Sequence, residues 1–170
     1  VGSEMCIRDS IKRVKVVDAG NSAGRIIFID NQNYNNGIQL NQINGPESDL
    51  PVTFIFSALK PVVLTGTITG NVRMFFAGDF QFGMGTETVA YNGLTMFMSN
   101  GDMKICSSIW SYKNNPGGGF LSSDKDITIV ESASFQGQIQ CRGNFKTSGL
   151  IQFNDSVLKA PGFTVPKGMK

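Results

Sequence analysis

The 170-residue sequence contains no histidine, and this absence removes several kinds of active site. Ser-His-Asp triads, Cys-His pairs and the usual zinc sites all need an imidazole. Charge is also scarce, because charged residues make up 16% of the chain, below the roughly 25% of ordinary soluble domains. The basic residues are scattered apart from Lys12, Arg13 and Lys15, whereas a nucleic-acid binder shows a clustered basic surface. We therefore expect no nucleic-acid partner.

Cysteines and long apolar runs are few. Neither Cys106 nor Cys141 belongs to a CxxC pair, and their positions in sequence do not show whether the fold brings them together. We interpret them as two separate buried thiols, and we predict no metal site and no cofactor. No apolar run approaches the roughly 20 residues that a membrane-spanning helix needs, so we expect no membrane insertion.

The first ten residues are set apart from the fold. Residues 4–10, EMCIRDS, resemble the translation of a transposase mosaic-end sequencing adaptor, which is a product of library preparation. Such segments are excluded before fold reasoning. We predict an artefactual or disordered tail over 1–10, a single β domain over 11–159 with an N-terminus open to truncation, and an extended tail over 160–170.

Short runs of β-branched and aromatic residues recur along the chain and are separated by turns rich in glycine and asparagine. This pattern is typical of strands, and no capped helical periodicity accompanies it. In residues 135–145 one face collects Phe135, Ile139, Cys141 and Phe145, together with two glycines. We expect buried strands at 25–30 and 52–56, further strands at 62–69, 72–76 and 80–82, and sheet corners at the glycine-containing joints between 66 and 85.

The stretch from Thr86 to Ile109 predicts a central three-strand antiparallel meander. Asn92-Gly93 and Asn100-Gly101 each separate strand-like runs, and this dipeptide is the strongest short-range signal for a type I′ hairpin. If the residues on either side of each turn are paired as in a hairpin, Met96 and Met98 fall on an apolar face of the meander and Phe97 falls on a more polar face. The predicted fold class is therefore all-β, a single antiparallel β-sandwich or jelly-roll-like domain.

A parallel β-solenoid is the alternative architecture. Gly137, Gly143 and Gly149 recur every six residues, as in hexapeptide-like coils. No fixed period extends across the chain, so the solenoid is ranked second.

The loop from Trp110 to Gly119 contains the candidate ligand-binding residues. Trp110 and Tyr112 share a strand face beside Asn114 and Asn115, which suits an aromatic platform for sugar rings with amides bonding the hydroxyls. The competing interpretation is that Trp110 caps the core, since tryptophan is usually largely buried. Sequence reasoning favours this second interpretation.

The acidic residues lie mostly in turns, and no catalytic carboxylate pair stands out among them. Asp124 with Asp126 is a weak calcium signal, and a solvated turn is favoured over a calcium site. We expect no enzyme activity. Beyond the adaptor, the chain resembles β-rich viral fibre, capsid-associated and surface adhesin domains in general character, without indicating one family. This resemblance implies a structural or adhesive module of an extracellular or virion assembly, which forms homo-oligomers or binds other assembly proteins. A carbohydrate-binding module is the alternative.

Overall fold

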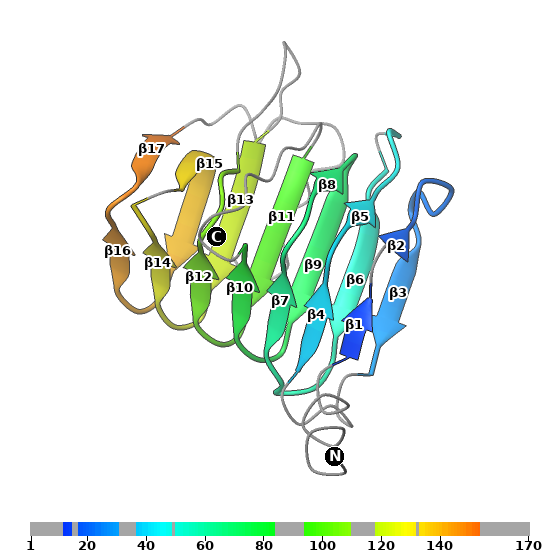
Figure 1. Ribbon diagram of the computed structural model, residues 1–170, viewed down its shortest axis with the longest axis horizontal. Coiled ribbons are helices and arrows are strands. Elements are labelled where there is room, and N and C mark those ends of the chain that lie inside the picture. The colour runs from blue at the N-terminus through cyan, green and yellow to red at the C-terminus, as the bar shows by residue number, and fades with distance from the viewer. Residues whose placement is uncertain are drawn as a thin grey trace, which may run out of the picture.

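A computed structural model describes residues 12–14, 17–30, 37–48, 50–83, 94–109, 118–131 and 133–153. Every regular element in these ranges is a β-strand, so they contain no helix that could cross a membrane. The strands form three sheets, and every strand pair that the structure describes is parallel (Figure 1). The all-β prediction is confirmed, and the pairing direction differs from the one predicted.

Two seven-stranded sheets form the long sides of the molecule, and a three-stranded sheet closes part of one edge. Sheet A contains β1 (Lys12–Val14), β4 (Ile38–Leu40), β7 (Val62–Leu64), β10 (Phe80–Phe82), β12 (Met103–Ile105), β14 (Ile127–Ile129) and β16 (Phe145–Thr147). Sheet C contains β3 (Ile26–Ile29), β6 (Val52–Phe56), β9 (Val72–Phe76), β11 (Leu94–Ser99), β13 (Gly118–Ser123), β15 (Ser134–Cys141) and β17 (Leu150–Phe153). Sheet B contains β2 (Val17–Asp18), β5 (Ile43–Asn44) and β8 (Ile68–Thr69).

The chain visits the sheets in a fixed order and therefore winds as a solenoid. Each coil places one strand in sheet A and the next long strand in sheet C, and then returns to sheet A beside its starting point. Coil length is uneven. The 24 residues from Ile38 to its register partner Val62 shorten to 18 from Val62 to Phe80.

The core lies between sheets A and C and is built from ladders of side chains at matching register positions. Phe76 and Phe97 from sheet C meet Phe80 from sheet A, with ring centroids 4.0 Å apart for Phe76–Phe80 and 4.7 Å for Phe80–Phe97. An aromatic pair such as Phe80–Phe97 adds about 0.5–1.5 kcal/mol beyond the burial of its rings. These contacts join the two sheets, whereas Phe56 and Phe76, which are in register in successive coils, stack along one ladder with ring centroids 5.2 Å apart. Further ladder positions are Leu40, Leu64, Phe82, Ile105 and Ile129 on sheet A, and Phe54, Met74 and Leu121 on sheet C.

The predicted antiparallel sandwich and its meander are wrong. The strand β11 pairs in parallel with β9 and β13, and β12 pairs with β10 and β14, so the two strands flanking Asn100-Gly101 belong to different sheets. Gly101 also lacks the positive φ that a type I′ turn requires. Asn92-Gly93 lies outside the described residues.

The predicted face assignment of β11 is reversed for the same reason. Phe97 belongs to the main core, whereas Met96 and Met98 are buried on the opposite face of the sheet. A side-chain period of two is common to parallel and antiparallel strands. Alternation therefore separated the two faces correctly but did not show which face meets the core.

Several local predictions are confirmed. The strands at 52–56, 72–76 and 80–82 have the predicted bounds. Gly78 lies in the corner between β9 and β10, and Gly83 directly follows β10. A Cβ at Gly83, where φ is +84°, would collide with the side chain of Ser107. The strand predicted at 25–30 is present but not buried, because it is the edge strand β3 and leaves Phe28 73% exposed.

The glycine spacing of six residues reflects the path within one coil, since Gly137 lies in β15 and Gly143 lies at the corner that follows.

Candidate functional site

A four-residue corner connects sheet C to sheet A in four successive coils. The corners are residues 76–79 (FAGD), 99–102 (SNGD), 123–126 (SDKD) and 141–144 (CRGN). Each corner is followed directly by a strand of sheet A with an apolar residue at its first position. The repeated corner therefore sets the start of sheet A and brings its side chains into register along the solenoid axis.

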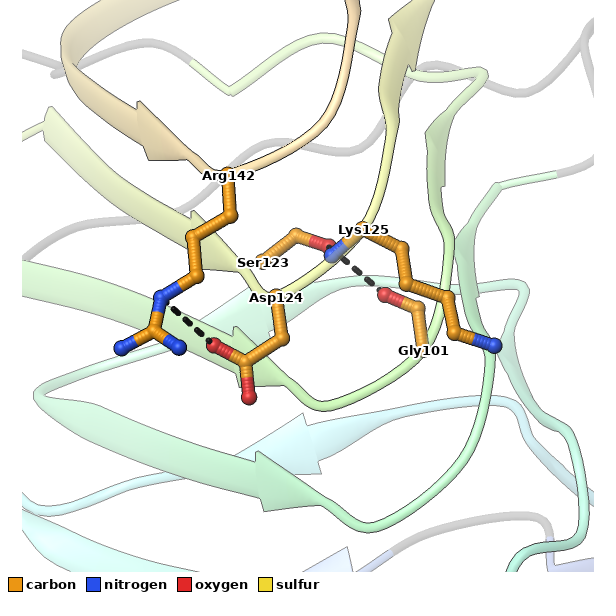
Figure 2. A network of polar contacts seen from close by, with 5 residues as sticks. All are labelled: Gly101, Ser123, Asp124, Lys125 and Arg142. Carbon is orange, nitrogen blue, oxygen red and sulfur yellow. Dashed lines mark hydrogen bonds and ion pairs between the residues drawn. The ribbon is translucent and has the colours of Figure 1, made fainter.

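Serine side chains join neighbouring corners. Ser99 Oγ donates to the backbone oxygen of Gly78 at 2.6 Å and accepts from the backbone N–H of Gly101 at 3.0 Å. One coil later, Ser123 Oγ repeats both bonds, donating to the backbone oxygen of Gly101 and accepting from the backbone N–H of Lys125 (Figure 2). Both serines are buried, so these bonds satisfy backbone groups that water does not reach easily.

Aspartates form a second ladder on the outer side of the same corners. Asp79 Oδ1 accepts from the backbone N–H of Asp102 at 2.8 Å, and Asp102 Oδ1 accepts from that of Asp126 at 3.1 Å. Asp126 Oδ1 continues the series to the backbone N–H of Asn144 at 2.7 Å. Each carboxylate thus connects its own coil to the next one.

An exposed ion pair flanks the corner at 123–126. Arg142 Nε lies 3.6 Å from Asp124 Oδ1, and both side chains are largely exposed (Figure 2). Exposed pairs of this kind contribute about 0–1 kcal/mol. Asp124 and Asp126, considered from sequence as a weak calcium signal, are therefore engaged in an ion pair and a backbone hydrogen bond respectively. Within the described ranges, no group of histidine, cysteine or acidic residues is arranged to hold a metal ion.

The outer face of sheet A carries one row of side chains in strict register. Gln39, Val63, Gln81, Lys104, Thr128 and Lys146 follow one another on β4, β7, β10, β12, β14 and β16. Adjacent members are separated by one strand spacing, about 4.8 Å in the hydrogen-bonding direction.

The middle of this row borders a depression of about 430 Å³, here called the sheet A groove. Its floor includes Val63, Gln81, Lys104 and Thr128, and the aspartate ladder lies along one side. The groove therefore offers carboxylate acceptors on one side and an amide, an ammonium and a hydroxyl on its floor, each supplied by a different coil. The lining is completed by Pro61, Val62, Asp79, Phe80, Asp102, Met103 and Asp126.

The binding residues predicted from sequence cannot be compared with this groove. Trp110, Tyr112, Asn114 and Asn115 all lie outside the described residues, so the aromatic platform stays a prediction. Sequence reasoning placed Asp79 and Asp102 only among the acidic residues in turns, and considered Asp126 also as part of a weak calcium signal with Asp124. Aligning the segments FAGDFQF, SNGDMKI, SDKDITI and CRGNFKT would have revealed the repeated corner, the solenoid and the row of groove residues together.

Among the described residues, Cys106 and Cys141 are separate free thiols, and the predicted burial holds for Cys106 but not for Cys141. Cys106 is buried and Cys141 only half-buried. Burial raises the pKa of the Cys106 thiol, and the nearby Lys104 ammonium partly opposes that rise. Cys106 is therefore a protonated, packing residue at neutral pH.

Comparison with known proteins gives this chain no assigned family. Protein-family models, curated proteins and solved structures were compared with it, and none of them matches. Its function has to be inferred from the groove and the coils that form it.

Proposed function

We propose that this chain is a non-catalytic adhesive module of an extracellular or virion surface assembly, and that its sheet A groove binds an extended, polyhydroxylated polymer, that is, a glycan. The observation that carries the proposal is the repetition of groove chemistry from coil to coil. Asp79, Asp102 and Asp126 occupy equivalent positions, as do Gln81, Lys104 and Thr128.

A periodic surface suits a periodic ligand. Parallel pairing repeats the same register position at each coil, so a polymer lying along the solenoid axis meets a new polar side chain at every step of about 4.8 Å. Each single contact is weak, because a typical hydrogen bond contributes about 0.5–1.5 kcal/mol net. Several equivalent contacts along one chain add up without any single deep pocket.

The charges along the groove favour a neutral polymer over a polyanion. Three carboxylates line the groove against one ammonium group, that of Lys104. A polyanion would place like charges beside the aspartate ladder, which lowers affinity. A neutral glycan can donate hydroxyls to the carboxylates and accept from the Lys104 ammonium.

The aspartates support a binding role rather than a catalytic one. Each of Asp79, Asp102 and Asp126 accepts a backbone N–H bond from the next coil. These carboxylates are therefore held in place as structural links, with the rest of the carboxylate available to a ligand. The low charge of the chain and its stacked sheets are also compatible with a module of a larger surface structure.

The test is binding of the full chain to soluble neutral and anionic polysaccharides, measured by calorimetry. We expect binding to a neutral glycan and weakening of about tenfold in Lys104→Ala, the loss of one charge-assisted hydrogen bond. The matched control is Lys146→Ala, since Lys146 occupies the same row two coils further on, outside the groove. Gln81→Ala and Gln39→Ala form a second such pair.

Three outcomes would contradict the proposal. One is equal loss of binding in Lys104→Ala and Lys146→Ala. Another is loss in Trp110→Ala with none in Lys104→Ala, which would place the ligand on the loop instead. A third is shortening of the polymer during incubation, seen by size-exclusion chromatography, which would show catalysis.

A further inference from the structure

One coil of the sheet A groove differs in chemistry from the coils beside it. The first residue of a sheet A strand donates its backbone N–H to the corner residue one coil further on, as Val62 does to the backbone oxygen of Asp79 at 3.1 Å. By the same bond, the backbone N–H of Ile38 donates to the backbone oxygen of Pro61 at 3.1 Å. Pro61 therefore stands, on the β7 coil, at the corner position where the next three coils carry the aspartate ladder.

Both groove positions of the β7 coil are apolar. Val63 occupies the row position that Gln81 fills one coil further on and Lys104 fills two coils further on. Pro61 is exposed and Val63 is half-buried, and both line the groove. We call these two residues the apolar step. The other groove coils each combine a carboxylate with a polar side chain, namely Asp79 with Gln81, Asp102 with Lys104, and Asp126 with Thr128.

The apolar step offers little to a sugar hydroxyl. Proline has no backbone N–H, and the backbone oxygen of Pro61 already accepts from Ile38. The backbone of β7 is paired on both sides, with β4 and with β10. The Gln81 amide next to it donates to the backbone oxygen of Gly83 at 2.8 Å. A hydroxyl placed here would lose water without gaining a partner, which is costly, whereas a methyl group gains free energy from burial.

A hydrogen-bond acceptor lies next to the apolar step. Asp79 is on the neighbouring coil, about one strand spacing of 4.8 Å away. Its Oδ1 accepts from the backbone N–H of Asp102 at 2.8 Å, which leaves Oδ2 for a donor on the ligand. The groove thus places an apolar surface and a carboxylate oxygen side by side.

We propose that this pair recognises an acetamido group, so that the glycan bound in the groove is built from N-acetylated amino sugars. The acetyl methyl packs on Pro61 and Val63, and the amide N–H donates to the Asp79 carboxylate. A 6-deoxy sugar would supply the methyl group but no N–H for Asp79. This inference rests on the proposed glycan binding and names the class of sugar.

The experiment measures binding of the full chain to three neutral tetrasaccharides by calorimetry. Cellotetraose, N-formyl chitotetraose and N-acetyl chitotetraose share one linkage and differ only in a hydroxyl, formamido or acetamido group on each sugar. We expect the acetamido form to bind about fourfold more tightly than the formamido form, which is the effect of burying one methyl-sized group. Cellotetraose, which lacks both the methyl group and the amide, should bind more weakly than the acetamido form.

Variants of the apolar step test where the methyl group binds. Val63→Thr replaces one methyl group of the step by a hydroxyl and keeps a β-branched residue, so the acetamido and formamido forms should bind with nearly equal affinity. Val63→Ala is the second variant should the first disturb the fold. Lys146→Thr introduces the same residue in the same row outside the groove, and should leave the difference in place.

Asp79→Asn tests the amide contact. The single side-chain oxygen of asparagine would be used by the backbone N–H of Asp102, which leaves an NH₂ group that cannot accept from the ligand. Binding of the acetamido form should weaken about tenfold, the effect of losing a hydrogen bond to a charged group.

The outcomes separate this inference from the proposed function. Equal binding of the three tetrasaccharides would keep glycan binding and overturn the acetamido assignment. A difference that survives in Val63→Thr and Val63→Ala, or unchanged binding of the acetamido form in Asp79→Asn, would overturn it as well. Binding to another neutral polysaccharide but to none of the tetrasaccharides would overturn this inference alone, and binding to no neutral glycan would overturn both proposals.

Discussion

Replacement of Thr95 by valine should stabilise this protein. Thr95 lies in β11, in register between Val72 of β9 and Gly119 of β13. Its side chain is 1% exposed, and Oγ1 has no hydrogen-bond partner in the described part of the chain. Valine has nearly the same shape, and its β-branched side chain suits a strand equally well.

The magnitude follows from the unpaired hydroxyl. A buried polar group without a partner costs about 1–3 kcal/mol relative to its hydrated state in the unfolded chain. Thr95→Val removes that cost and adds a methyl group at an apolar position. We therefore expect the free energy of unfolding to rise by about 1–2 kcal/mol, and the Tm by about 2–8 °C.

Urea unfolding with an unchanged m-value is the appropriate assay, because a shift in midpoint alone reports a change in stability. Thr53→Val is the matched control. Thr53 is also buried in sheet C, but its Oγ1 accepts from Arg73 Nε at 3.0 Å. Burial lowers the pKa of that guanidinium, and losing its acceptor should reduce stability by about 1 kcal/mol. If Thr95→Val is neutral or destabilising while Thr53→Val destabilises, the hydroxyl of Thr95 is satisfied and the reasoning fails.

Two further predictions concern the corners and the buried thiol. Asp102→Ala should lower the free energy of unfolding by about 0.5–1.5 kcal/mol, because the backbone N–H of Asp126 loses its acceptor. Asp102→Asn keeps a side-chain oxygen that can accept this bond, and should be close to neutral by urea unfolding. Cys106 should react with a thiol reagent more slowly than Cys141 at pH 8. Because the folded-state pKa of Cys106 is raised, the unfolded thiol ionises first as pH increases, so stability should begin to fall above about pH 8.5. This slope should disappear in Cys106→Ala, and an identical slope in that variant would show that another group causes it.

Much of the local structure could be predicted from sequence because it depends on neighbouring residues. Val52–Phe56 and Val72–Phe76 were predicted as strands with the bounds that the structure shows. β-branched and aromatic residues favour an extended backbone wherever the strand lies. The glycine-containing joints were also predicted as corners, since their backbone constraints are local.

The pairing direction was not predictable from the same signals. Asn100-Gly101 fits a hairpin in sequence, yet the glycine is needed there because a Cβ would collide with Asp79 of the previous coil. Uneven coils of 18 and 24 residues also concealed the period. The structural limits of the predicted domain at 11 and 159 stay predictions, because those residues lie outside the described ranges.

The sequence by itself determined that this protein is built of short strands with alternating faces and has no imidazole chemistry, because both follow from residue types and their local spacing. The tertiary structure alone decided that the strands stack in parallel and that Gln81, Lys104 and Thr128 form one row. Those residues lie more than twenty positions apart, and only the packing of one coil on the next brings them within a strand spacing of each other.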